Sequence, residues 1–298
     1  MKAGSKFDIW QQQARAQAEL TLSRLLPSEN LLEADLIAAM RYSALEGGKR
    51  LRPMLVLAAA ELGNADAKAI EYAMAAVECI HIYSLVHDDM PEMDNDSLRH
   101  GKPTCHIRYN QATALLVGDA LQTMAFTLLS KPTLLPPARQ LQMIQILATA
   151  AGCTGMAGGQ AIDLAHVGKS IDQAGLEHMH QLKTGALIRA SIALGGLCCE
   201  DVSETALSAL DQYAINLGLA FQVIDDVLDY EQETSVLGKT AGKDAQANKP
   251  TYVSLMGLTK ARQYAETLIQ QAIDALNQFD QRADHLRALA QYVTARNH

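Results

Sequence analysis

The chain has 298 residues, of which 49% are hydrophobic and 19% are charged, an ordinary globular balance that excludes a disordered or fibrous protein. The formal net charge is −8, and without a dense basic block this argues against a nucleic-acid partner. The length allows a large core, arranged as one domain or two.

The cysteines are scattered and form no C-x-x-C pair: Cys79, Cys105, Cys153, Cys198 and Cys199. Their odd number indicates neither a disulfide framework nor a zinc site, and free thiols are typical of a reducing cytoplasm, which is the location we expect. The amino terminus has no signal-peptide pattern. No apolar run reaches the ~18 residues of a membrane span, so we do not expect an integral membrane protein.

The sequence pattern is helical nearly everywhere. Ala and Leu dominate, aromatic residues are 5%, and Val-Ile-Thr alternation is scarce, so we expect an all-α protein. In chain order the expected helices cover about 8–25, 31–46, 53–62, 66–90, 110–129, 138–152, 173–195, 203–230, 251–257, 259–279 and 282–296, to within about 2–4 residues. No linker or internal repeat divides the chain, so we expect one domain over residues 1–298.

A basic loop, "GGKRLRP", follows the second expected helix. Gly47 and Gly48 let the backbone come close to an anion, and Lys49, Arg50 and Arg52 supply charge. The loop is not a P-loop, because G-x-x-x-x-G-K-S/T is absent. Taken singly, each of these cations is more often a surface charge.

The fourth expected helix ends in a first cluster of aspartates, Asp88, Asp89 and Asp94. Asp88 and Asp94 would lie on different faces of a straight helix, since each residue turns about 100°. Pro91 stands between them and should end or kink the helix. We therefore expect the chain to fold Asp94 back toward Asp88.

The second cluster, Asp225, Asp226 and Asp229, lies inside a long expected helix. Asp225 and Asp229 are about 40° apart on one face, and Gln222 shares that face one turn earlier. An unbroken helix can therefore present this cluster as it stands.

Two clusters of three aspartates are hard oxygen ligands. They suit Mg²⁺, which takes one or two carboxylates and fills its other positions with water or substrate phosphates. A single acidic pair would be better explained as solvated surface or a helix cap, but two clusters, each joined to a long apolar helix, weaken that explanation. Further cations that could bind phosphates are Arg99, Lys102, Lys183, Lys239, Lys243 and Lys249. The sequence predicts a site for a polyanion bridged by magnesium.

Five motifs, "GGKRLRP", "HDDMPEMDND", "GGQAIDL", "KTGALI" and "FQVIDDVLD", resemble those of the trans-polyprenyl (isoprenyl) diphosphate synthases in order and spacing. The resemblance runs from about Tyr42 to Tyr252 and is to the short-chain bacterial farnesyl diphosphate synthases. It implies an all-α isoprenoid-synthase helical bundle around a deep central cavity, in a homodimer. It also implies Mg²⁺-dependent condensation of dimethylallyl or geranyl diphosphate with isopentenyl diphosphate, mainly to farnesyl diphosphate.

The resemblance also implies roles for the matching positions. Three Mg²⁺ would be held by Asp88, Asp89, Asp94, Asp225, Asp226 and Asp229. The allylic diphosphate would be bound by Arg99, Lys183, Lys239 and Lys249. The isopentenyl diphosphate would be bound by Lys49, Arg52, His81 and His100. The catalytic set around the reacting carbons would be Lys183, Thr184 and Gln222. In "GGQAIDL", we interpret Gln160 and Asp163 as cavity lining and helix packing.

The two histidines expected to bind isopentenyl diphosphate, His81 and His100, differ in their support. His81 and Ser84 lie seven and four residues before Asp88 and share its helical face, which favours His81 as a ligand contact over a satisfied core histidine. His100 departs from the family, which usually has a second arginine there. A neutral imidazole is a weaker anion partner than a guanidinium, so we expect weaker substrate binding rather than loss of the reaction.

Tyr83 and Ser84, the fifth and fourth residues before the aspartates, are the expected determinants of product length. In the resembling family a bulky aromatic at the fifth position closes the cavity floor after fifteen carbons, so we expect farnesyl diphosphate. The alternative is that Tyr83 is a core tyrosine packed away from the cavity.

Several other functions stay open at this point. A geranyl or geranylgeranyl diphosphate synthase differs only in product. A terpene cyclase shares the fold but usually carries an Asn/Ser/Glu triad in place of the second aspartate motif. An HD-type metal phosphohydrolase, a different class, would account for His87-Asp88 but not for Asp89, Asp94 or the second cluster. A non-catalytic partner subunit would be expected to have lost aspartates.

Overall fold

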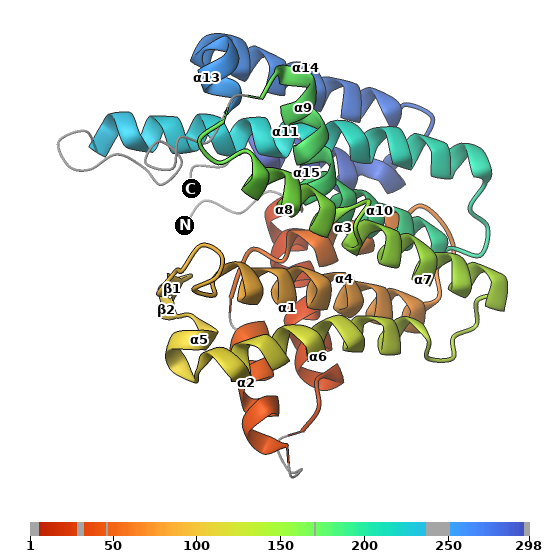
Figure 1. The fold of residues 1–298 in the computed structure, drawn as a ribbon. Coiled ribbons are helices and arrows are strands. Elements are labelled where there is room, and N and C mark those ends of the chain that lie inside the picture. The colour runs from red at the N-terminus through yellow and green to blue at the C-terminus, as the bar shows by residue number, and fades with distance from the viewer. Residues whose placement is uncertain (1–5, 29–32, 46, 170, 237–250, 295–298) are drawn as a thin grey trace.

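The computed structural model describes residues 6–28, 33–45, 47–169, 171–236 and 251–294. Helices make up most of these residues (Figure 1), which confirms the all-α prediction. The helices are α1 Lys6–Leu25, α2 Ala34–Ala44, α3 Leu51–Ala60, α4 Ala67–Asp88, α5 Cys105–Arg108, α6 Gln111–Leu129, α7 Pro137–Ala151, α8 Met156–Ala165, α9 Gln173–His180, α10 Ala186–Leu197, α11 Glu204–Val236, α13 Tyr252–Met256, α14 Leu258–Ala275 and α15 Asp284–Thr294. A two-stranded hairpin, β1 Leu98–Arg99 and β2 Lys102–Pro103, follows α4.

The helices pack around two hydrophobic cores that share a central layer. One core lies around α4 and α6, and the other lies around α11, α14 and α15. Helices α3 and α10 contribute to both, because Val56 and Leu187 pack into the first core while Leu55 and Ile188 pack into the second. A helix that is apolar all round is a buried one. The expectation of one domain over 1–298 stays a prediction, which this shared layer supports.

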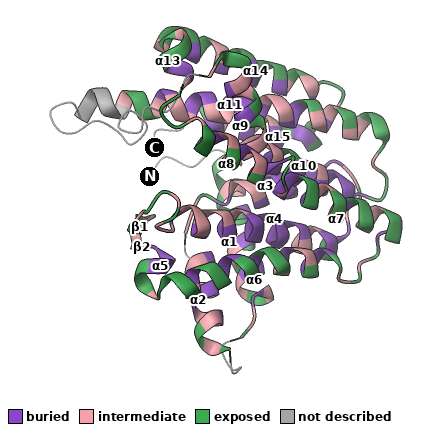
Figure 2. Ribbon diagram, viewed as in Figure 1, coloured by how far each residue is buried: buried purple, intermediate pink, exposed green. Residues whose placement is uncertain are grey.

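Helices α4 and α6 are long and apolar enough to cross a membrane by length and composition alone, which corrects the statement that no such stretch occurs. In α4 67% of the relevant window is buried inside the protein, and in α6 39%. Helix α4 is therefore a core helix, whose apolarity comes from packing on several sides. Helix α6 packs on α4 with one face and leaves the other exposed (Figure 2).

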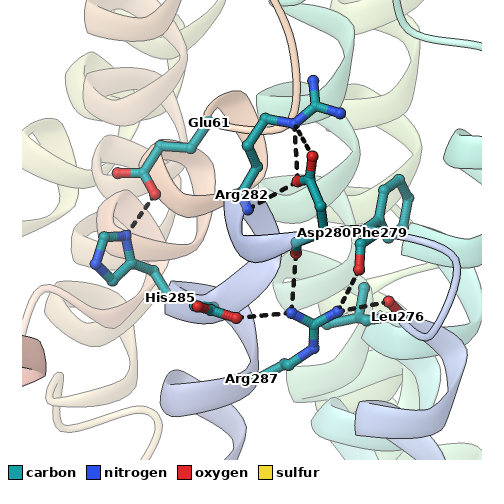
Figure 3. Close-up of polar contacts among 8 residues, drawn as sticks. Glu61, Leu276, Phe279, Asp280, Arg282, His285 and Arg287 are labelled. Carbon is teal, nitrogen blue, oxygen red and sulfur yellow. Dashed lines mark hydrogen bonds and ion pairs between the residues drawn. The ribbon is translucent and has the colours of Figure 1, made fainter.

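The carboxyl-terminal helix is tied down by a polar network (Figure 3). The guanidinium of Arg287 donates to the carbonyls of Leu276, Phe279 and Asp280, which follow α14. Nδ1 of His285 lies 2.5 Å from a carboxylate oxygen of Glu61, the residue that follows α3. These contacts fix α15 against the end of α14 and against α3.

Three features differ from the expected elements. The helix expected over 173–195 is interrupted by a π-helical turn, Gln181–Gly185, between α9 and α10. Helix α8 was missed because its adjacent glycines look like a break. Gly159 is needed there, since a Cβ would lie 2.2 Å from the backbone nitrogen of Lys183. The hairpin was missed because its strands have two residues each; both of its turn residues have positive φ, His100 at 50° and Gly101 at 76°, which suits a tight antiparallel turn.

Candidate active site

The chain turns back on itself directly after α4. The backbone N–H of Asp94 donates to the carbonyl of Asp88 at 2.9 Å, and Asp96 donates to the carbonyl of Asp89 at 3.1 Å. Asn95 takes a positive φ of 50° to complete the turn, a conformation that asparagine tolerates. The expectation that Pro91 ends the helix and returns Asp94 to Asp88 is confirmed.

The surroundings of Asp88 disfavour the ionised form of its carboxyl group. Burial is the main cause that raises its pKa from 3.8 to about 6, and Asp94 and Asp89 raise it further, whereas Lys183 and Arg99 oppose the rise. A group in this position needs a cation to hold it ionised. The carboxylates of this turn are hard oxygen donors of the kind that a divalent ion prefers.

Asp89 is held by Arg99. Nε of Arg99 donates to both carboxylate oxygens at 2.9 and 2.8 Å, and its Nη2 donates to Oδ1 at 2.6 Å. Asp89 is buried, with 3% of its surface exposed. A carboxylate accepts about four hydrogen bonds, so the fork occupies most of its capacity. The metal role of Asp89 stays a prediction, and its observed role is to orient Arg99.

Two aspartates of the second cluster, on α11, have different hydrogen-bond partners. Gln222 donates to Oδ2 of Asp225 at 3.4 Å, while the backbone N–H of Tyr252 donates to Oδ2 of Asp226 at 2.7 Å. Asp225 is also close enough to influence the pKa of Arg52. Within the described parts of the chain, no three His, Cys, Asp or Glu side chains converge closely enough to hold a metal ion. The ligand set therefore stays a prediction.

The residues expected to bind isopentenyl diphosphate lie together. Burial lowers the pKa of His81 well below 6.5, and the charges of Arg52 and Arg99 and the nearby His100 lower it further. Burial likewise lowers the pKa of His100, with contributions from Arg99 and Lys49. Arg52 and His100 therefore lie near His81, and Lys49 lies near His100; we call these four residues the cationic cluster after Lys49 and Arg52.

Arg52 has a buried donor atom that an anion could bind. Its Nε is buried and has no hydrogen-bond partner among the described residues. Burial lowers its pKa, against the opposing charges of Glu78 and Asp225. Leaving a buried charged donor unpaired is costly, so a ligand oxygen at this atom would be strongly favoured.

A pocket opens beside this cluster. The lining residues that matter here are Gly47, Gly48, His81, Arg99 and His100. The ring of His100 lies against the glycine turn, with Cδ2 3.6 Å from where a Cβ of Gly47 would be. The absence of side chains at Gly47 and Gly48 therefore leaves room for the ring of His100 beside the pocket.

Lys183 lies in the π turn and pairs with Asp163. Its Nζ is 2.6 Å from Oδ2 of Asp163, and it lies close enough to Asp88 to lower the pKa of that carboxyl. Asp163 is 8% exposed. The interpretation of Asp163 as cavity lining and helix packing stays a prediction, to which the structure adds an ion pair that restrains Lys183. Such π turns are frequent at functional sites, and Thr184 follows in the same turn.

Tyr83 is buried between α4 and α6. Its ring packs edge-on against His87 at 5.9 Å between centroids, and its hydroxyl lies near Gln122 of α6. Ser84 bonds to the carbonyl of His81 at 2.8 Å. The role of both residues in product length stays a prediction. Lys239 and Lys249, expected at the allylic diphosphate, lie outside the described residues.

Comparison with known proteins gives a consistent result. The family model described as polyprenyl synthetase matches residues 33–292. The chain is 46% identical over 286 residues to the farnesyl diphosphate synthase of Escherichia coli strain K12, covering 94% of this chain and 96% of that one. It is similar to the apo structure of an FPP/GFPP synthase from Zymomonas mobilis, with TM-score 0.87, 42% identity and coverage of 96% and 98%. It is also similar to a Helicobacter pylori geranyltransferase complexed with magnesium and isoprenyl diphosphate, with TM-score 0.82, 32% identity and coverage of 99% and 100%.

Proposed function

The chain belongs to the polyprenyl synthetase family, and from that premise we propose how its residues divide the work of the reaction. The enzyme is a short-chain prenyltransferase of isoprenoid biosynthesis that makes farnesyl diphosphate. The observation that carries the assignment of residues is the position of Arg99, which pairs with Asp89 and lies close enough to Asp88, His81 and His100 to affect the pKa of each.

The allylic diphosphate binds beside Lys183, Arg99 and the aspartates. Mg²⁺, which the Helicobacter pylori relative binds, would neutralise the leaving diphosphate. We propose that Asp88, Asp94 and Asp225 are among its ligands, that Asp89, Asp226 and Asp229 complete the set, and that three ions are held. The raised pKa of Asp88 supports this, because a carboxyl that is buried among like charges fits a cation site.

Lys183 and Arg99 stabilise charge on the leaving group. Breaking the allylic C–O bond leaves a carbocation and a diphosphate anion, and fixed cations oriented toward that anion lower the barrier. Asp163 and Asp89 hold these two cations in place. Lys239 and Lys249 join the same diphosphate in this proposal.

Isopentenyl diphosphate binds in the cationic cluster. Its phosphate oxygens accept from Arg52, whose Nε has no partner among the described residues, and from Lys49, with His81 and His100 beside them. The double bond then meets the carbocation in a cavity that excludes water. Thr184 and Gln222 face the reacting carbons, and the departed diphosphate takes the final proton, since no strong base stands in the described part of the site.

The exposed face of α6 supports a homodimer. Leu115 and Leu116 are 48% and 53% exposed, and Ile107 on α5 is 55% exposed. Contiguous exposed apolar residues mark protein–protein interfaces. A Leu116→Glu variant should be monomeric in light scattering where the parent chain is a dimer. We also propose a cytoplasmic location, since the described cysteines are all free.

Incubation with dimethylallyl diphosphate, isopentenyl diphosphate and Mg²⁺, followed by chromatography of the dephosphorylated products, tests the reaction. We expect farnesol as the main alcohol and no product when chelator removes the metal. Release of inorganic phosphate without any new carbon chain would instead favour the phosphohydrolase alternative.

A further inference from the structure

Arg50 is the best-buried cation of the basic loop. Its side chain is only 3% exposed. Nε donates to Glu19 on α1 at 2.8 Å, Nη1 donates to Glu78 on α4 at 2.7 Å, and Nη2 donates to the carbonyl of Ala44 at the end of α2 at 2.5 Å. One guanidinium therefore joins three helices. A buried charge is tolerated only when it is paired in this way.

The backbone around Arg50 is in an unusual conformation. Arg50 has φ 54° and ψ 34°, which is left-handed, and it precedes the first residue of α3. Gly48 has φ 73°. A side chain with a Cβ is strained in the left-handed region, and such residues persist where surrounding contacts over-determine them. The buried fork of Arg50 supplies those contacts.

The neighbouring cations Lys49 and Arg52 belong to the same stretch of backbone. Lys49 lies between the two left-handed residues, and Arg52 lies in the first turn of α3. The donors of Arg50 are directed to protein acceptors, whereas Nε of Arg52 has no partner among the described residues. The donors of Arg50 are therefore taken up by the protein, whereas Nε of Arg52 stays available to an anion. Glu78 connects the two, since its charge also acts on Arg52.

We propose that Arg50 is a positioning residue for isopentenyl diphosphate: its buried fork holds the loop 47–52 in the left-handed conformation that brings Lys49 and Arg52 together beside His81. This inference rests on the proposed function of the loop. Lysine cannot replace Arg50 in this role, because an ammonium keeps the charge but cannot reach three separated acceptors in a fixed plane.

The test is Arg50→Lys, which keeps the charge near the substrate and removes the fork. We expect the KM for isopentenyl diphosphate to rise at least about tenfold, the equivalent of one charge-assisted hydrogen bond, while the allylic KM and kcat stay within twofold. Equal rises in both KM values, a loss confined to kcat, or an unchanged isopentenyl KM would overturn the proposal.

Arg287→Lys is the matched control. Arg287 also forks to three carbonyls and to the Asp284 carboxylate (Figure 3), but on α15 rather than beside the cationic loop. Arg287→Lys should lower the melting temperature and leave the isopentenyl KM unchanged.

If Arg50→Lys does not fold, Glu19→Gln replaces it, since Glu19 is a partner of Arg50 that is 28% exposed. Glu19→Gln should give a smaller rise in the isopentenyl KM with the same selectivity. An unchanged isopentenyl KM would overturn the proposal.

Lys49→Ala separates this inference from the function on which it rests. If Lys49→Ala leaves the isopentenyl KM unchanged, the loop is not the isopentenyl diphosphate site and both ideas fail. If Lys49→Ala raises that KM and Arg50→Lys does not, the site stands and only the positioning role of Arg50 is wrong.

Discussion

Lys183 and Asp163 form a 2.6 Å ion pair that joins the π turn to α8. The pair restrains an ammonium that lies close to Asp88, where the leaving diphosphate binds in our proposal. Lysine has a flexible stem, so without Asp163 its ammonium would sample many positions. In this proposal the carboxylate of Asp163 acts on the leaving group through the position of Lys183.

Asp163→Asn should lower kcat about tenfold to a hundredfold, less than removal of a stabilising donor outright, because the amide keeps the shape of Asp163 but attracts the ammonium weakly. Steady-state kinetics measure this. Asp211→Asn is the control, since Asp211 pairs with Arg189 on the exposed surface, and exposed pairs contribute little. Equal kcat in parent and Asp163→Asn would show that Lys183 needs no such restraint.

Asp88→Ala or Asp225→Ala should lower turnover by about a hundredfold or more at saturating Mg²⁺, because each removes a proposed metal ligand rather than core volume. Circular dichroism should show an intact fold. Near-normal turnover in either variant would contradict its assignment as a ligand.

His100→Arg should lower the KM for isopentenyl diphosphate and leave the allylic KM nearly unchanged. A charge-assisted bidentate contact is stronger than a neutral one by ~1–3 kcal/mol, and burial together with Arg99 lowers the pKa of His100, so the imidazole is neutral at pH 7. His178→Arg adds the same charge at an exposed position and should change neither KM. An unchanged isopentenyl KM in His100→Arg would mean that this side chain is not at the diphosphate.

Tyr83→Ala should shift the products toward geranylgeranyl diphosphate or longer chains, because it removes the aromatic ring expected to close the cavity floor. The ring is 9% exposed, so the variant should also lose stability, by about 3 kcal/mol or more. Chromatography of the dephosphorylated products measures chain length, and Tyr72→Ala on the same helix is the control. Products that still stop at fifteen carbons would place the floor at another residue.

His180→Phe should make stability less dependent on pH. Burial lowers the pKa of His180 from 6.5 to about 4; Lys183 adds to the drop, while Asp163 and Gln222 oppose it. Between these values the unfolded state binds more protons than the folded state, so stability falls as the pH falls from 6.5 toward 4, by up to about 3 kcal/mol.

Phenylalanine can keep the stacking of this ring on Tyr252, 5.6 Å away, without titrating. Melting temperatures at pH 7.5 and pH 5 measure the effect, with His178→Phe on the same helix as the exposed control. Parallel pH profiles for the parent and His180→Phe would show that His180 does not contribute to acid sensitivity.

The sequence by itself determined the helical class and most helices. Local composition and 3.6-residue periodicity decide these, and they act over a few turns. It also determined the break after Asp88, because Pro91 acts on its immediate neighbours. The motifs further indicated which side chains could bind the diphosphates, and among these Arg52 and His100 lie close enough to His81 to affect its pKa.

Only the tertiary structure decided how those charges are paired. Asp89 is held by Arg99, Asp163 by Lys183, and Arg50 by Glu19 and Glu78. In the latter two cases the partners come from separate helices, so no local pattern identifies them. The π turn likewise depends on the close approach of Gly159 to Lys183. Burying an unpaired charge is costly, so each buried ion must have a partner of opposite charge. Which partner lies near it depends on how the helices pack, and local sequence does not specify that packing.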